Sequence, residues 1–275
     1  MKDPCLTEVL ESASPYRPRQ SSAIWQAPID GWREKLAETL EQAGGQNPTF
    51  FFRADDIGAG GRAFEAMCAL FRHHAIPLGM AVVPAWLSAT RSKQLFEHAP
   101  LNEHLWGWHQ HGWRHVNWQK TGKKSEFGEH RPLEKQWRDI WQGQQKLQEI
   151  FGKHLLSVFS PPWNRLSLST LKILQQLEFK AVCMEGQLPR GIRPPLTLKN
   201  LKLQLDLHTR KAKDGPADYD TLLSELGRLL GKREPIGIML HHQRMTVHAF
   251  EFLDEMMSML KEKLGARFIH FSDLL

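Results

Sequence analysis

The chain has 275 residues, 41% hydrophobic and 24% charged, so it is long enough for one large α/β domain or two small ones and has an ordinary globular composition. Its net charge of +6 suggests an anionic partner, but the basic residues are dispersed apart from the run KTGKK at 120–124, so a mildly basic, solvated surface is favoured over nucleic-acid binding. Three cysteines, Cys5, Cys68 and Cys183, form no disulfide framework and are typical of a reducing compartment.

The predicted elements begin after an N-terminal segment, residues 1–28, that is rich in proline, serine and charge and is expected to lack regular structure. A helix follows, with Asp30 as its predicted N-cap and Gly44-Gly45 as its stop. From residue 49 onward, strand patterns alternate with helix patterns. The predicted strands cover residues 49–52, 78–83, 104–109, 155–160, 179–184, 201–207, 236–240 and 267–271. The predicted helices cover residues 61–74, 90–99, 133–151, 167–177, 217–231 and 247–264.

This alternation predicts a single α/β domain with a parallel sheet, covering residues 29–275. About eight strands favour a closed or nearly closed barrel over an open doubly wound sheet. The opening residues lack the apolar core of a signal peptide, and no later segment approaches the length of a membrane span. We therefore expect a cytoplasmic protein without a membrane span.

Five predicted strands end in groups that carry chemistry, which matters because a parallel barrel places its active site at the carboxyl ends of its strands. These strand ends are Asp55-Asp56, the HQHGWRH stretch, SPPWN at 160–164, Asp206 with His208, and LHHQ at 240–243. Each has an ordinary structural alternative, such as a helix cap for the aspartates, a stiff turn for the prolines and a core position for the histidines. Their joint placement favours a hydrolytic site.

The stretch WGWHQHGWRHVNW, residues 106–118, contains three histidines, of which His111 and His115 stand four apart. On a helical turn this spacing would place both rings on one side, where they could bind one metal ion. The spacing alone is weak evidence, since it also arises by chance and loop histidines often bond to the backbone. A third ligand has to come from elsewhere in the chain.

The order RADDIG, HGWRH, SPPWN, LD and MLHH resembles the polysaccharide deacetylases of carbohydrate esterase family four, the nodulation-type deacetylase domain. That family carries an Asp-Asp motif, an H-S/T-x-x-H motif, an R-P-P-Y turn, an aspartate–tryptophan motif and an L-x-H motif in this order. The resemblance spans roughly residues 49–271 and implies a single distorted (β/α) barrel with about seven to eight parallel strands.

The resemblance also implies roles for individual residues. Asp55 would be the general base, and Asp56, His111 and His115 would hold a divalent metal ion, with Zn²⁺ favoured and Co²⁺, Ni²⁺ or Mn²⁺ also compatible. His241, at the L-x-H position, would protonate the leaving nitrogen. The expected substrate-binding residues are Trp163, Arg53, Asp206, His242 and Trp113.

Three departures from the family pattern bear on substrate choice. Ser160 stands where the family has an arginine, Ile57 displaces the glycine after Asp-Asp, and Asp206-Leu207-His208 replaces the aspartate–tryptophan motif. His242 follows His241 where the family has an acidic residue, so the acid could be either histidine.

The sequence therefore predicts a metal-dependent hydrolase that removes an acetyl group from an N-acetylated sugar or glycan precursor. A carbohydrate or small acetamido compound is the expected substrate. Two alternatives stay open: hydrolysis of another non-peptide C–N bond on the same fold, and a degenerate protein that binds a glycan without turnover. Nucleic-acid binding rests only on the net charge and is not expected.

Overall fold

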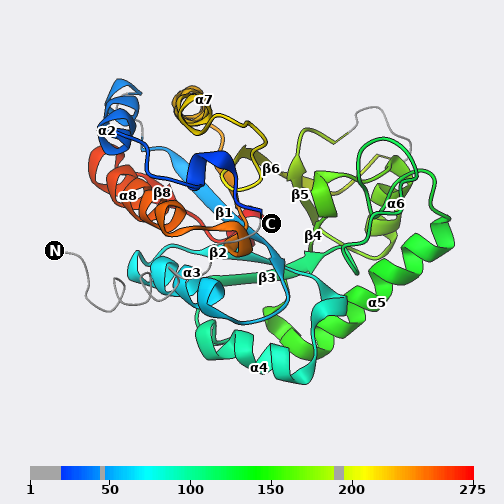
Figure 1. The fold of residues 1–275 in the computed structure, drawn as a ribbon. Coiled ribbons are helices and arrows are strands. Elements are labelled where there is room, and N and C mark those ends of the chain that lie inside the picture. The colour runs from blue at the N-terminus through cyan, green and yellow to red at the C-terminus, as the bar shows by residue number, and fades with distance from the viewer. Residues whose placement is uncertain (1–19, 44–46, 189–194) are drawn as a thin grey trace. The chain divides into compact units, whose positions relative to one another are not determined.

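The computed structural model describes residues 20–43, 47–188 and 195–275 (Figure 1). Most of the N-terminal segment 1–28 lies outside these ranges, and so does the predicted helix stop Gly44-Gly45. The described end of that segment contains a short 3-10 helix, η1 (Ala23–Trp25), whose Ile24 and Trp25 are buried.

All eight predicted strands are present in the described residues. They are β1 (Thr49–Ile57), β2 (Leu78–Val82), β3 (Trp106–His111), β4 (Val158–Ser160), β5 (Ala181–Glu185), β6 (Lys199–Asp206), β7 (Ile236–Leu240) and β8 (Arg267–Phe268). Their hydrogen-bonded order is β2-β3-β4-β5-β6-β7-β1-β8, and β2 also pairs with β1. Seven strands therefore close into a ring, with β8 added beside β1. This confirms the predicted fold class, a distorted (β/α) barrel.

The helices follow the strands in alternation, as predicted. They are α2 (Trp32–Gln42), α3 (Arg62–His73), α4 (Ala89–His98), α5 (Leu133–Phe151), α6 (Leu168–Gln176), α7 (Gly215–Leu230) and α8 (Val247–Leu264). Four of them begin at a side chain that accepts a hydrogen bond from a backbone N–H of the first turn: Ser88, Ser167, Asp214 and Thr246. Each such cap stabilises its helix by about 1 kcal/mol, so local sequence fixes where these helices start.

The described residues form two compact units. Unit 1 comprises the residues up to Ala54, together with Gly60–Leu78 and Gln204–Ile269. Unit 2 comprises Asp55–Ala59, Gly79–Leu203 and His270–Leu275.

Unit 1 is built around β1, which pairs in parallel with β7 and β8. Helix α2 packs against both α7 and α8, and the three can be followed together in Figure 1. The core is aromatic: the ring of Phe52 meets Phe71 edge-on at 5.3 Å, and Phe50 stacks on Phe268 at 5.8 Å between centroids. The run TFFF is therefore a strand buried on both faces.

The 3-10 helix η1 is held on unit 1 by hydrogen bonds to two loops. The indole N–H of Trp25 donates to the carbonyl of Leu207 at 2.5 Å, and Ser22 Oγ donates to the carbonyl of His208 at 3.0 Å. The hydroxyl of Thr246 donates to the carbonyl of Trp25 at 2.6 Å. These bonds tie together the loops that follow β6 and β7.

Unit 2 contains the parallel pairs β3–β4, β4–β5 and β5–β6. Helix α5 packs against α6 (Figure 1), and the buried side chains include Phe127, Ile140 and Phe159. Strand β4 is only three residues long because Pro161 follows it directly and offers no N–H to a neighbouring strand. The chain therefore turns sharply at the end of β4.

The structure corrects several predicted boundaries. The N-cap of α2 is Gly31 and not Asp30, because the position has a left-handed φ of 66°, which glycine adopts without strain. Strand β3 lies two residues later than predicted, so His111 belongs to the strand. Strand β1 continues to Ile57. Strand β8 ends at Phe268, since the His270 ring accepts a hydrogen bond from Ser272 N at 3.1 Å and starts η6 (Phe271–Leu274).

Candidate metal centre

One group of at least three His, Cys, Asp or Glu side chains within the described ranges brings its ligand atoms within 4.8 Å of one another: Asp56, His111 and His115. Asp56 Oδ1 lies 3.4 Å from His111 Nε2 and 3.2 Å from His115 Nε2. The exposed fraction of the side chains is 1% for His111, 16% for His115 and 19% for Asp56. The group is therefore half-enclosed and open on one side. All three residues belong to unit 2.

The backbone of β1 is bent at Asp56, which has a φ of 61°. In a regular strand the side chains of Asp55 and Asp56 would point to opposite faces of the sheet. Because Asp56 itself is left-handed, both carboxylates approach the same imidazole: Asp55 Oδ2 lies 4.0 Å from His111 Nε2, and Asp56 Oδ1 lies 3.4 Å from it. A non-glycine residue in this region is strained, and such strain is concentrated at functional sites.

The ring of His111 is oriented by Ser160, at the end of the neighbouring strand β4. Its Nδ1 lies 2.9 Å from the carbonyl oxygen of Ser160, which can only accept, so Nδ1 carries the proton and Nε2 presents its lone pair to the candidate metal position. The hydroxyl of Ser160 lies 2.9 Å from Nε2 of His109, whose Nδ1 donates to the carbonyl of Gly107. The Ser160 carbonyl thus orients His111, and the buried His109 contacts the side chain of the same serine.

His115 is positioned by its loop and not by a helix. The predicted helical turn is wrong, because His111 ends a strand and the chain then reverses through Gly112 and His115, with φ values of 56° and 59°. A Cβ at position 112 would stand 2.3 Å from Glu126 Oε2 and 2.6 Å from a carbon of Pro162, so only glycine fits.

Glu126 holds this loop in place. The carboxylate is fully buried and accepts hydrogen bonds from three successive backbone N–H groups, at 3.2 Å from Trp113, 2.8 Å from Arg114 and 3.2 Å from His115. Burial raises the pKa of Glu126 although these three donors favour the charged form. The loop therefore depends on one acidic residue eleven positions beyond His115.

Two tryptophans flank the ring of His115. The ring of Trp163 lies 4.4 Å from it and that of Trp86 lies 5.8 Å from it, centroid to centroid. Trp163 has a φ of 57° in the turn that follows Pro161-Pro162. Burial among these groups lowers the pKa of His115 to about 4, against the opposing attraction of Asp56. The imidazole is therefore neutral near pH 7, the form that binds metal ions.

Trp113, predicted to bind substrate, is partly buried and packs against the core beneath α5 and α6. Its indole N–H is buried without an acceptor among the described residues. Its backbone carbonyl accepts a hydrogen bond from Ala85 N at 3.0 Å.

The remaining predicted site residues belong to unit 1. His241 follows β7, is 8% exposed, and donates its backbone N–H to Nδ1 of His208 at 3.1 Å. Because Nδ1 accepts this bond, neutral His208 carries its proton on Nε2, which has no acceptor among the described residues. His208 is fully buried, and burial lowers its pKa well below the ordinary value of 6.5, with smaller contributions from His241, Arg244 and His242.

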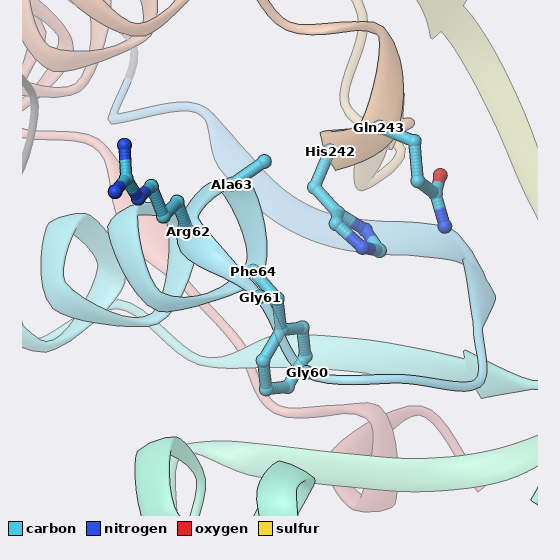
Figure 2. A pocket seen from close by; sticks show the side chains of 7 residues that line it. All are labelled: Gly60, Gly61, Arg62, Ala63, Phe64, His242 and Gln243. Atoms are coloured by element: carbon cyan, nitrogen blue, oxygen red, sulfur yellow. The ribbon is translucent and has the colours of Figure 1, made fainter. Parts of the chain in front are cut away.

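His242 lines a cavity of about 410 Å³ together with Gln243 and residues 60–64 at the start of α3. Figure 2 shows the rings of His242 and Phe64, which come from η5 (His242–Arg244) and from α3. These rings meet edge-on with centroids 5.6 Å apart. His241 and His242 thus have different surroundings, as expected for successive residues at a strand end.

Arg53 and Asp206 are engaged within unit 1. Arg53 is fully buried and its Nη2 donates to the sulfur of Met239 on β7 at 3.3 Å. Asp206 accepts hydrogen bonds from the backbone N–H groups of His208 and Thr209, both at 3.0 Å, and from the Thr209 hydroxyl. The Asp206 carboxylate therefore shapes its own loop, and substrate contact by either residue stays a prediction.

Six of the predicted residues thus lie in unit 2 and four in unit 1. The first set is Asp55, Asp56, His111, His115, Trp113 and Trp163, and the second is Arg53, Asp206, His241 and His242. The sequence did not single out Glu126 or Trp86. Trp86 carries a signal that was available, since PAW after the second strand repeats the PPW pattern after the fourth.

Several solved structures have a fold similar to that of this chain. A putative polysaccharide deacetylase from Mycobacterium smegmatis aligns with a TM-score of 0.58 at 13% identity over 84% of this chain and 90% of its own. A pseudoenzyme of carbohydrate esterase family four from Bacillus anthracis aligns with a TM-score of 0.51 at 12% identity, over 83% of this chain and 65% of its own. A peptidoglycan N-acetylglucosamine deacetylase aligns with a TM-score of 0.52 at 14% identity, over 84% of this chain and 90% of its own.

The chain has a fold similar to that of these solved structures. The fold that the motif resemblance implied is thereby confirmed, and the low identities agree with a divergent sequence. No protein-family model matches the chain, and no curated protein sequence does. Within the described ranges, none of the helices combines the length and the hydropathy that a bilayer crossing demands.

Proposed function

We propose that this chain is a metal-dependent hydrolase that removes the acetyl group from an N-acetylated sugar or glycan precursor. The observation that carries the proposal is the approach of Asp55 and Asp56 to the same imidazole, His111, with His115 completing the group. With two adjacent carboxylates at one site, Asp56 can bind the metal ion while Asp55 accepts a proton. The deacetylase fold supports this division.

The donor set fits a divalent ion. Two imidazole nitrogens and one carboxylate oxygen suit Zn²⁺ or a similar borderline ion and leave positions for water and substrate. The Ser160 carbonyl fixes the tautomer of His111 that can bind metal, and burial keeps His115 neutral. A bound ion would polarise the amide carbonyl and acidify a water molecule.

The chain's own residues would then move the protons. Asp55 would accept the proton of the attacking water as general base, and His241 would donate a proton to the leaving nitrogen, since an amine leaves poorly unless protonated. The backbone bond from His241 to His208 would hold His241 in place. Trp163 and Trp113 would border the sugar, with Arg53, Asp206 and His242 as further proposed substrate contacts.

A second candidate, glycan binding without turnover, is favoured by Ser160. The arginine that the family has at this position is absent, and one of the similar structures is a pseudoenzyme. Ser160 uses its carbonyl and hydroxyl to brace His111 and His109, so it does not substitute for an arginine side chain beside the base.

The test is acetate release from N-acetylated sugars, chitooligosaccharides and nucleotide sugars by protein loaded with Zn²⁺ or Co²⁺. We expect acetate and free amine in equal amounts, both lost in Asp55→Asn. Turnover confined to small amides or cyclic ureides would favour the other C–N hydrolase. Saturable glycan binding without acetate release would favour the degenerate binding protein.

A further inference from the structure

The large hydrophobic side chains that are exposed in the described residues all come from residues 116–168 of unit 2. They are Val116, Trp118, Leu133, Trp137, Trp141 and Leu168, with exposed fractions between 38% and 52%. We call these six residues the apolar patch. Scattered exposed hydrophobic residues are normal in proteins, but a concentration in one region marks an interaction surface.

Helix α5 contributes a continuous stripe to the patch. Leu133, Trp137 and Trp141 are spaced four apart, so they lie along one face of the helix over about 12 Å. The rings of Trp137 and Trp141 stack nearly parallel, at 10° and 5.9 Å between centroids, and both remain 40% exposed. The two stacked indoles therefore present a large part of their surface to solvent.

The loop after His115 contributes Val116 and Trp118, and the start of α6 contributes Leu168. The guanidinium of Arg131 lies over the ring of Trp118, with its Cζ 5.0 Å from the ring centroid. Arg131 is two residues before Leu133. Trp118 N donates to the carbonyl of Ser125, and Arg165, three residues before Leu168, donates to the carbonyl of Lys124 at 3.1 Å. These contacts connect the loop with the starts of α5 and α6, so the six residues belong to one structured region.

The surroundings of the patch are basic. Residues 114–142 expose six basic side chains and two acidic ones. The basic residues are Arg114, Lys120, Lys123, Lys124, Lys135 and Arg138, and the acidic residues are Glu129 and Glu134. The other charged groups of this stretch are buried: Glu126 caps the loop, and Arg131 pairs with Asp139. The exposed excess is thus four positive charges around exposed indoles.

We propose that the apolar patch and its basic surroundings dock on the surface of an anionic lipid bilayer. Tryptophan favours the interface between lipid headgroups and acyl chains, where its ring is apolar and its N–H stays hydrated. Aliphatic side chains gain free energy when they enter the acyl boundary. Each lysine or arginine near an anionic surface adds about 1 kcal/mol of attraction.

The composition of the patch disfavours other occupants. A second copy of the chain would bring like charges face to face, which opposes self-association. A nucleic acid or a glycan would use the indoles for stacking, but Val116, Leu133 and Leu168 offer neither stacking nor hydrogen bonds to such partners. Aliphatic, aromatic and basic groups together match a lipid surface.

Docking would place the candidate metal centre near the bilayer, because Val116 directly follows His115 in the same unit. A lipid-linked acetamido substrate would then be within reach, and this consequence rests on the proposed function. The docking itself does not, since it involves no metal or turnover.

The test is flotation of the full chain with vesicles of phosphatidylcholine and with vesicles of equal parts phosphatidylcholine and phosphatidylglycerol. We expect binding to the anionic vesicles that weakens with salt. The double variant Trp137→Ser, Trp141→Ser should bind about tenfold more weakly. The triple variant Lys120→Glu, Lys123→Glu, Lys124→Glu should bind at least about 100-fold more weakly.

Two controls separate docking from folding and from catalysis. The matched triple variant Lys211→Glu, Lys213→Glu, Lys232→Glu changes exposed lysines of unit 1 and should bind vesicles much more strongly than the patch triple. Asp56→Ala should bind like the wild type, so failure of the proposed hydrolysis leaves this test intact. All variants are compared by circular dichroism and thermal melting.

Several outcomes would overturn the proposal. They are absence of vesicle binding, equal binding to neutral and anionic vesicles, and equal effects of the two lysine triples. Vesicle binding as strong as that of the wild type by a folded tryptophan double variant would also contradict it. Binding of single-stranded nucleic acid or dimerisation that depends on Trp137 and Trp141, without vesicle binding, would assign the patch to those partners.

Discussion

Two regions of this chain are rich in histidine, and the histidines have different neighbours and hydrogen-bond partners in each. In unit 2, His111 and His115 face the carboxylate of Asp56. The Ser160 carbonyl orients His111, and the loop held by Glu126 positions His115. In unit 1, His208 bonds to the backbone of His241. The nearby carboxylate of Asp206 is turned into its own loop.

This difference shows how the surroundings assign a role to an imidazole. Neutral rings that converge on a carboxylate have the properties of metal ligands. A buried ring that neighbours other histidines, as His208 does, is held neutral by burial and by their charges, and it serves as a hydrogen-bond partner. We therefore propose metal binding for the first region, and proton transfer and its support for the second.

The largest expected effect separates the two aspartates of β1. Asp55→Asn should lower kcat by about 10²–10⁴-fold, because it removes the general base. Metal content should stay at the wild-type level, since Asp56, His111 and His115 are untouched. Steady-state kinetics with metal analysis of the same sample checks this. Metal loss would mean that both aspartates coordinate, and near-normal turnover would refute the assignment of the base.

The next effect tests proton donation in unit 1. His241→Ala keeps the backbone N–H that bonds His208 but removes the imidazole, so kcat should fall by about 10²-fold or more with metal retained. An activated aryl ester should partly rescue this variant because its leaving group needs no proton. His242→Ala is the matched control and should mainly affect stability. Rescue of His242→Ala and not of His241→Ala would identify His242 as the acid.

A smaller effect tests the loop that carries His115. Glu126→Gln should weaken metal binding about 10–100-fold, because an amide cannot accept all three backbone N–H bonds that the carboxylate accepts. Glu129→Gln, a nearby exposed acid, is the control and should bind metal normally. Titration against a chelating dye measures both. Unchanged affinity in Glu126→Gln would show that the loop holds His115 without this support.

The smallest effect concerns stability and pH at His208. Its pKa is lowered in the folded state, so as pH falls below about 6.5 the unfolded chain takes up a proton first and the folded state loses stability. His208→Gln should remove this contribution, which reaches about 1.4 kcal/mol per pH unit. Urea unfolding between pH 7 and pH 5.5 compares the two proteins. Identical pH dependence would contradict a neutral, buried His208.

The sequence predicted what local patterns determine. Alternating strand and helix patterns located the β-strands and α-helices of the described residues but not the 3-10 helices such as η1, and Asp55, Asp56, His111 and His115 stood out at strand ends. It did not predict the geometry that long-range contacts impose. The left-handed backbone at Asp56 and His115 cannot be seen in the spacing of residues, and the HxxxH motif was placed on a helical turn that does not exist.

The supports of the site were missed for a similar reason. Glu126 lies in a loop without a recognisable pattern, and only folding brings its carboxylate to the backbone of residues 113–115. Ser160 was noted as a missing arginine, whereas its carbonyl and hydroxyl brace two histidines. Side chains that act through the backbone leave little trace in a motif.

The most direct test of the account is the metal content of the purified protein after loading with Zn²⁺ and desalting, measured by elemental analysis. The account predicts one ion per chain in the wild type, in His109→Ala and in a variant of the exposed His104 that precedes β3, His104→Ala. It predicts a large loss in Asp56→Ala, His111→Ala and His115→Ala. A wild type without bound metal, or metal retained by a folded His111→Ala, His115→Ala double variant, would contradict the central claim that these three residues form a metal centre.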